Sequence, residues 1–417
     1  MKPQNRGHSR ARRRFLQSGA LVAGGLVIAA CGSNEAANRV YAEPKADDPK
    51  KDEPQKSEGK LVYGALLCGG RLVNTETNEE RFVFTQLSID QTLKNRAEKI
   101  PLIAQKLITD IGFLPHGVIK NPTAPHKVLV FEKKGRGGAE IDLKENKVIN
   151  RIEPGDGRAF YGHGAYSTDH KVIYATQYDE ETYEGTMVLR DATDFKVIGD
   201  FPTHGEWPHD CQFIDDGKTV AITNGGGNIK GGAAPNVSYV NVADGKLIEK
   251  IEFDNAAINA GHLIISDHGD LAVGHAMREG LDTREALGGL SIRPKNAKFK
   301  TMVTPAEVTG AMKGETLSLC MLHDKKIVAA TNPYGRPNGI VTFWNYETQK
   351  YVDKLEIEQP RGVALTLDNK YWIVTFGKDT PGFILLSTET NQPEDPPVVF
   401  AASSQGSHVY IHDYYAD

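Results

Sequence analysis

The stretch GKTVAITN, at Gly217–Asn224, decides the fold, because KKIVAATN, at Lys325–Asn332, matches it without a gap 108 positions later. Each stretch joins a turn to a short run of small and β-branched apolar residues, which is typical of a β-strand. Histidines that precede apolar runs mark the intermediate steps at intervals of 47, 46 and 53 residues: His116, His163, His209 and His262. The chain therefore repeats a unit of about fifty residues.

A period of forty to fifty residues that holds about four short strands is typical of a β-propeller blade. Counting from His116 to His408, the repeat has seven anchor positions, with Leu317 and Gly362 in place of histidine at two of them. The sequence predicts an all-β, seven-bladed β-propeller over residues 61–417. Strands from the two ends of this region close the ring, since closure removes exposed sheet edges. A short helical insert is predicted at Ile89–Ile111, interrupted at Pro101.

The first thirty residues have the character of an export signal and not of folded structure. Arg12 and Arg13, followed by Phe15 and Leu16, resemble the bacterial twin-arginine signal. The apolar run that follows, at 19–30, is short for a permanent membrane span. An ordinary basic signal region is the alternative.

The stretch VIAAC, at Val27–Cys31, resembles a lipobox, in which small residues precede a cysteine that becomes acylated. Cys31 is then the first mature residue, and a plain cleavage site with an incidental cysteine is the alternative. Residues 31–60 are charged and almost free of large apolar side chains, so they are expected to form a disordered tether. We therefore expect a periplasmic or cell-envelope protein, bound to the membrane through a lipid. The net charge of −5 argues against a nucleic-acid partner.

Several motifs resemble the exported bacterial propellers grouped as domain of unknown function 1513 (DUF1513): FEKKGR, GRAFYGHGAYS, FPTHGEWPHDC, AITNGGG, PNVSYVNV and TNPYGRPNGIVTFW. The likeness covers about His116 to Phe376. Trp207-Pro208-His209-Asp210 replaces the family's Gly-Pro-His-Glu, and the glycine-rich NIKGGAAPN replaces a longer loop with a histidine. The family's biochemical function is not established. Its members tend to be encoded near imelysin-like iron-uptake lipoproteins, so the resemblance implies metal handling and a periplasmic iron-uptake partner.

The histidines suggest where chemistry lies. The first strand of each propeller blade lines the central channel, so residues at its start converge on one mouth. Imidazoles converging from separate rigid strands suit a transition metal such as copper or iron, or a small ligand. The candidates are His116, His163, His209, His262 and His408. Cys211, two residues after His209, is expected on the same side of its strand and adds a candidate thiolate. The alternative is a structural role, in which the imidazoles hydrogen-bond neighbouring blades.

Three functions stay open: metal or ligand binding at the hub, a lactonase-like periplasmic hydrolase, and a protein-binding scaffold without chemistry. The hydrolase needs a metal-bound water or a close acid–base pair. No Gly-x-Ser-x-Gly motif is present, and we do not expect catalytic cysteines. The sequence leaves open whether the protein is an enzyme, and it leans toward a protein without enzymatic activity. The segment GGGNIKGG, at Gly225–Gly232, is expected to be a flexible loop on one face, since no helix pattern follows it.

Overall fold

The computed structural model describes residues 60–73, 77, 79–98, 106–281, 288–335, 338–377, 381–394, 397–399 and 408–415. All of them belong to one compact unit, Gln55–Asp417. The predicted signal with Arg12 and Arg13, the lipidation site Cys31 and the tether lie outside the described residues. Among the described helices, none has the length and apolar character needed to cross a bilayer.

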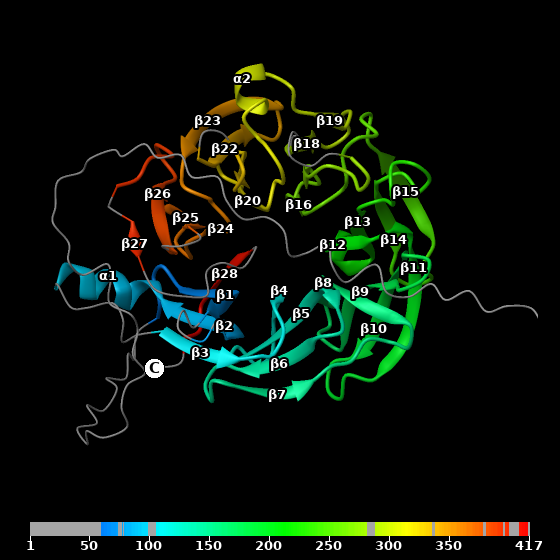
Figure 1. Cartoon of the computed structure of the whole chain (residues 1–417), viewed down its shortest axis with the longest axis horizontal. Helices are drawn as coiled ribbons and strands as arrows, with labels where there is room; N and C mark the ends of the chain where they lie inside the picture. The colour runs from blue at the N-terminus through cyan, green and yellow to red at the C-terminus, as the bar shows by residue number, and fades with distance from the viewer. Residues whose placement is uncertain are drawn as a thin grey trace, which may run out of the picture. The chain divides into compact units, whose positions relative to one another are not determined.

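Antiparallel sheets follow one another around a central axis in a β-propeller arrangement (Figure 1). Four of the four-stranded sheets are built from consecutive strands. They comprise β12 (Pro208–Ile214), β13 (Thr219–Asn224), β14 (Asn236–Asn241) and β15 (Leu247–Glu252); β16 (Leu263–Ile265), β17 (Leu271–His275), β18 (Gly289–Arg293) and β19 (Lys300–Thr301); β20 (Ser318–Leu322), β21 (Ile327–Asn332), β22 (Ile340–Asn345) and β23 (Lys350–Glu356); and β24 (Val363–Leu365), β25 (Tyr371–Phe376), β26 (Gly382–Ser387) and β27 (Val398–Val399). The first strand of each lies nearest the axis (Figure 1).

A fifth four-stranded sheet joins the two ends of the unit. Its strand order is β28 (Val409–His412), β1 (Ala65–Val73), β2 (Glu80–Ser88) and β3 (Lys106–Asp110). The register pairs Ala65 with His412 and Cys68 with Val409. The predicted closure by strands from both ends is therefore confirmed.

The arrangement of the remaining strands differs from the predicted seven blades. In the part of the chain that the structure describes, five four-stranded blades are separate, while the strands expected to form two further blades are joined in one eight-stranded sheet. These strands are β4 (Pro115–Lys120), β5 (Lys127–Gly135), β6 (Gly138–Asp142), β7 (Lys147–Arg151), β8 (Arg158–Tyr166), β9 (Val172–Asp179), β10 (Glu184–Asp191) and β11 (Val197–Glu206). The joint forms because β5 runs beyond its pairing with β6, so that Lys133 and Gly135 pair with Tyr161 and Phe160 of β8. Seven separate blades, as predicted, are not observed.

The predicted helical insert is also shorter than expected. Helix α1 covers Ile89–Ala97 and begins at Ser88, whose side chain accepts a hydrogen bond from the Gln91 amide. The second half of the predicted helix contains β3, which pairs with β2 from Val83 to Leu87. Tertiary pairing along an available sheet edge therefore overrides the local helical pattern in this segment. The described residues also contain the short helix α2 (Ala306–Thr309) and the 3₁₀ turn η2 (Asp215–Gly217).

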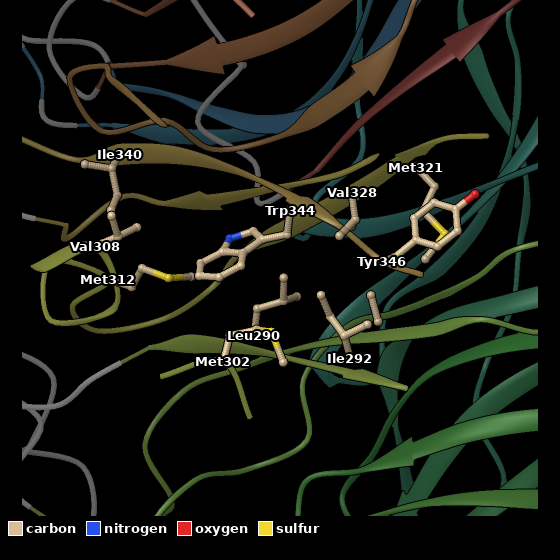
Figure 2. Packing of buried hydrophobic residues seen from close by; sticks show 11 residues of the cluster. Leu290, Ile292, Met302, Val308, Met312, Met321, Val328, Ile340, Trp344 and Tyr346 are labelled. Carbon is tan, nitrogen blue, oxygen red and sulfur yellow. The ribbon is translucent and has the colours of Figure 1, made fainter. Parts of the chain in front are cut away.

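Apolar side chains between neighbouring sheets form the core. The cluster between the β16–β19 sheet and the β20–β23 sheet is centred on Trp344, whose indole lies next to Met312 and Leu290 (Figure 2). The side chains of Trp344 and Leu290 are fully buried. Such interlocked packing fixes the sheets relative to one another, and it therefore fixes the inner strands that meet at the axis.

Candidate metal centre

Five buried imidazoles meet at the axis of the propeller. His116, His163 and His209 lie in β4, β8 and β12, while His262 and His408 directly precede β16 and β28. Each is between 3% and 8% exposed. Among the ring pairs in contact, the centroids lie 4.1 to 5.6 Å apart. The structure thus brings together all five histidines that the sequence periodicity singled out.

The nitrogen atoms approach one another closely enough to share an ion. His209 Nε2 lies 3.0 Å from His262 Nε2, and His408 Nε2 lies 3.3 Å from His116 Nε2. One nitrogen from each of four rings lies within 4.8 Å of the others: His116, His163, His209 and His262. Nitrogens bound to one tetrahedral ion at about 2.0 Å are about 3.3 Å apart. The two short contacts are close to that edge, whereas nitrogens 4.8 Å apart must approach by about 1.5 Å to share a tetrahedral ion.

Two nitrogens of the cluster have no hydrogen-bond partner in the described residues. They are His163 Nε2 and His209 Nδ1, and both are buried. A ring of histidines kept only for hydrogen bonds between blades would be expected to satisfy its buried nitrogens. Buried imidazole nitrogens without a hydrogen-bond partner are available to a ligand.

Asp210 orients two of the rings. Its carboxylate oxygens lie 3.4 Å from His163 Nδ1 and 3.5 Å from His262 Nδ1. The carboxylate also accepts hydrogen bonds from the amides of Cys211 and Leu263. A carboxylate beside Nδ1 favours the tautomer that carries the proton there, which leaves the Nε2 lone pair for a metal. His163 Nε2 is one of the unpartnered atoms, and His262 Nε2 faces His209.

Simple strand alternation predicts that Asp210 and His209 point to opposite sides, with Cys211 beside His209. A register shift in β12 between Pro208 and Cys211 breaks that alternation. Asp210 therefore faces the histidines, and Cys211 packs in an apolar cluster with Tyr174, Val220 and Ile222. Burial raises the pKa of the Cys211 thiol far above its usual range. The structure thus places Cys211 outside the group of four, as a protonated thiol.

Burial also controls the charge of the cluster. It lowers the pKa of all five imidazoles, most strongly for His116, His209, His262 and His408. The neighbouring imidazoles and the Lys133 ammonium act in the same direction. Lys133 forms an ion pair with Glu315, with 3.7 Å between Nζ and Oε1. The five rings are therefore neutral near pH 7, which is the form that binds metals.

Two glycines let the inner strands approach this closely. Gly162 has φ +102°, and a Cβ there would lie 2.5 Å from His116 Cδ2. A Cβ on Gly117 would lie 2.3 Å from the Gly162 carbonyl oxygen. Gly117, which follows His116, and Gly162, which precedes His163, are therefore required for steric reasons. Sequence reasoning missed these contacts and Lys133, although all three residues stand in the motifs PHG, YGHG and FEKKGR.

A cavity of about 430 Å³ adjoins the cluster along the axis. His163, His262, His408 and Asp210 form part of its lining, together with residues of every inner strand. A ligand on this side would have access to three of the five rings. At the two inner-strand positions without histidine, Leu317 is buried, and a Cβ on Gly362 would lie 2.4 Å from the Val409 amide nitrogen. At Gly362 the backbone is therefore too close to β28 to leave room for a side chain.

A family model described as "Protein of unknown function (DUF1513)" matches residues 113–401. The chain belongs to the DUF1513 family. The match confirms the family resemblance expected from the motifs. Four of the hub histidines of this DUF1513 chain fall inside the matched range, and His408 lies beyond it. No curated protein matches the chain.

Solved structures share the fold of this DUF1513 chain. Hydrazine synthase of Kuenenia stuttgartiensis superposes with a TM-score of 0.54 at 12% identity, covering 84% of this chain and 99% of that one. The dihydro-heme d1 dehydrogenase NirN, in complex with DHE, gives a TM-score of 0.54 at 11% identity, covering 85% of this chain and 76% of that one. At such low identity, these similarities support the propeller architecture alone.

Proposed function

We propose that the protein is an exported, lipid-anchored β-propeller that binds a transition-metal ion at its hub. The observation that carries this proposal is the group of four buried imidazole nitrogens, all within 4.8 Å of one another, from four separate segments at the axis. Each ligand stands on a different inner segment, His116 and His163 in the eight-stranded sheet and His209 and His262 in two separate blades, so packing between the sheets supports the geometry. His408, 3.3 Å from His116, is the fifth candidate ligand.

The chemistry of the ligand set favours copper. All five candidate donors are neutral imidazoles, and Asp210 faces Nδ1 atoms instead of entering the set. Imidazole suits copper, zinc and iron, but non-haem iron sites commonly include a carboxylate ligand, and Cu²⁺ binds nitrogen donors more tightly than the other divalent ions of its row. Copper is therefore the first metal to test, with zinc and iron as comparisons.

The test measures metal content and stability on the same samples. Purified protein is loaded with copper, zinc or iron, dialysed and analysed for metal, and then melted. The double variant His163→Ala/His209→Ala should lose bound copper and keep its circular dichroism spectrum. His204→Asn is the matched control, because His204 lies outside the cluster and has φ +63°, which asparagine tolerates.

The structural alternative gives a different result. If the imidazoles serve only as hydrogen-bonding groups, the wild-type protein takes up no metal. The double variant then loses about 1–3 kcal/mol of unfolding free energy. That outcome would overturn the metal proposal.

The cavity favours a second candidate, hydrolysis of a small ester or lactone by a metal-bound water. Its supporting observation is that His163, His262 and His408 line a space of about 430 Å³. Hydrolysis of a lactone panel by copper- or zinc-loaded protein, and its absence in the double variant, would support this activity. Metal binding without hydrolysis of any lactone would contradict this second candidate and support metal binding as the only function of the hub.

Export and anchoring form a separate part of the proposal, supported by the N-terminal sequence. Cys31→Ser should release the protein from the membrane fraction into the soluble periplasmic fraction. Replacing Arg12 and Arg13 by lysine should block export by the twin-arginine route. A Cys31→Ser protein that still fractionates with membranes would contradict the lipid anchor.

A further inference from the structure

A column of aromatic rings leads from a half-exposed position on the blade to the histidine cluster. Tyr183 stacks on Trp207, with ring centroids 4.6 Å apart and an interplanar angle of 16°. Trp207 lies 5.5 Å from Tyr161, and Tyr161 meets His209 edge-on at 5.1 Å. Tyr178 flanks Trp207 at 4.6 Å. The rings are in continuous contact from Tyr183 to the proposed metal ligand His209.

The backbone holds the outer end of this column in an unusual conformation. Trp207 has φ 56° and Tyr183 has φ 66°. A left-handed backbone is uncommon for residues as bulky as these, and such outliers cluster at functional sites. The Trp207 amide donates a hydrogen bond to the Tyr183 carbonyl oxygen at 3.1 Å. The strained pair is thus locked together, which keeps the two rings stacked.

The column passes from partial exposure to full burial. Tyr183 and Trp207 are half-buried, whereas Tyr161 is 9% exposed and His209 is 3% exposed. Lys134 covers the Trp207 ring, with its Nζ 4.6 Å from the centroid. A cation over an indole face fixes the ring further. Packing alone explains a buried aromatic pair, but it does not require two strained residues aligned with a candidate metal ligand.

We propose that Tyr183, Trp207, Tyr161 and His209 carry single electrons between the hub metal and an external one-electron redox partner. This inference rests on the proposed function, with copper as the metal. In the reducing direction, the partner loses one electron and Cu(II) becomes Cu(I). In the oxidising direction, Cu(I) loses one electron to the partner. At the metal no bond forms or breaks. An oxidised indole keeps its N–H, whereas an oxidised tyrosine releases its hydroxyl proton to a neighbouring acceptor or to water and recovers it on re-reduction. The proposed hub is therefore a redox site whose electrons enter and leave at the stacked pair Tyr183 and Trp207.

The experiment uses the full chain loaded with Cu(I). A laser flash on tris(bipyridine)ruthenium(II), with a sacrificial electron acceptor in solution, generates the ruthenium(III) complex, a bulky one-electron oxidant. The appearance of Cu(II) is followed by absorption and by electron paramagnetic resonance. The wild-type protein should show a fast phase of Cu(I) oxidation. Trp207→Phe, which keeps the aromatic packing but removes the readily oxidised indole, should lose that phase. Trp207→Tyr should retain it. Tyr334→Phe is the control, since Tyr334 is 60% exposed and outside the column.

The copper content of each sample separates the two proposals. A wild-type protein that takes up no copper refutes the proposed metal function and, with it, this inference. Full copper content with an unchanged fast phase in Trp207→Phe refutes the electron path alone. Loss of the phase in both Trp207 variants assigns the effect to packing and also refutes the path. If Trp207→Phe fails to fold, Tyr161→Phe removes only a hydroxyl and tests the same column.

Discussion

At the scale of single residues, the main property of the hub is that burial keeps its imidazoles neutral. Five imidazoles lie together at the axis, and Asp210 is the carboxylate that faces two of them. Burial holds their pKa values down, and the nearby Lys133 ammonium adds to this effect. An internal cluster of this kind stays uncharged without a metal, and so it does not need an ion in order to fold.

The lowered pKa values predict an acid-sensitive protein. In the unfolded chain these imidazoles titrate near pH 6.5, and in the folded chain they titrate at lower pH, chiefly because they are buried. Between the two values the unfolded chain binds more protons, so stability rises with pH. The contribution of the neutral, buried imidazoles to the free energy of unfolding is fully present above about pH 6.5. It is lost as the pH falls through the folded pKa values.

Melting of the metal-free protein between about pH 7 and pH 5 tests this prediction. The wild type should lose stability on acidification, and His209→Gln should show a shallower dependence. A melting temperature that stays constant over this range would contradict it. The same shift implies that copper is retained below the pH at which free imidazole protonates.

Gly162→Ala should damage the hub without touching a ligand. The new Cβ would lie 2.5 Å from His116 Cδ2, in a backbone with φ +102°. His116 must then move out of the cluster, and the strained backbone adds a cost of about 1 kcal/mol or more. We expect reduced copper content and a lower melting temperature. The control is Gly199→Ala, where a Cβ would meet nothing within 4 Å. Equal metal content in the two variants would contradict the steric argument.

At the scale of elements, local irregularities decide which side chains reach the site. The register shift in β12 leaves Asp210 beside two imidazoles, while Cys211 packs among apolar side chains. Side-chain contacts also fix the glycine-rich segment that follows β13. Arg278 is buried, and its guanidinium donates to the carbonyl oxygens of Gly227, Gly232 and Ala233. The segment expected to be a flexible loop is therefore clamped from a neighbouring blade.

Arg278→Met should release this clamp. Three carbonyl oxygens lose a charged donor, and we expect a loss of about 1–3 kcal/mol in unfolding free energy. Amide hydrogen exchange should rise over residues 225–235. Arg293→Met serves as the control because its ion pair with Glu249 is partly exposed, so its loss should cost about 1 kcal/mol or less. If exchange in the loop were unchanged by Arg278→Met, the clamp would have no measurable role.

The elements also show how far the sequence predicts this protein. The ungapped match of GKTVAITN to KKIVAATN and the histidine spacing suffice for the propeller architecture, the closing strands and the meeting of five histidines. These sequence patterns do not predict the structure where pairing between strands distant in the sequence determines it. The end of β5 pairs with β8 instead of ending with its own blade, and β3 forms where a helix was predicted. The apolar packing of Cys211 could not be read from strand alternation, because a bulge leaves no mark in it.

At the scale of the whole molecule, the ring depends on a single closing strand. β28 pairs with β1 over four residue pairs, from Ala65–His412 to Cys68–Val409. Val409 and Ile411 pack in the same apolar cluster as Leu66 and Cys68. The strand therefore protects the β1 edge, buries apolar surface and follows directly after His408.

Deletion of residues 407–417 should open the propeller. It exposes the β1 edge and removes the apolar contacts of Val409 and Ile411, so we expect aggregation or a large fall in melting temperature. Sedimentation and thermal melting measure the outcome. His408→Ala, in the full-length chain, is the control that removes the imidazole and keeps the strand. A truncated protein that stays soluble and melts like the wild type would rule out this closure.

The position of β28 also fixes when the hub can exist. His408 and His116 touch across a separation of 292 residues. A growing polypeptide therefore displays His116, His163, His209 and His262 well before the strand that completes their enclosure has been synthesised. Closing so long a loop comes late, because its entropic cost is met only once the intervening blades have folded. We therefore expect the proposed metal site to be enclosed only after β28 has paired with β1 and closed the ring.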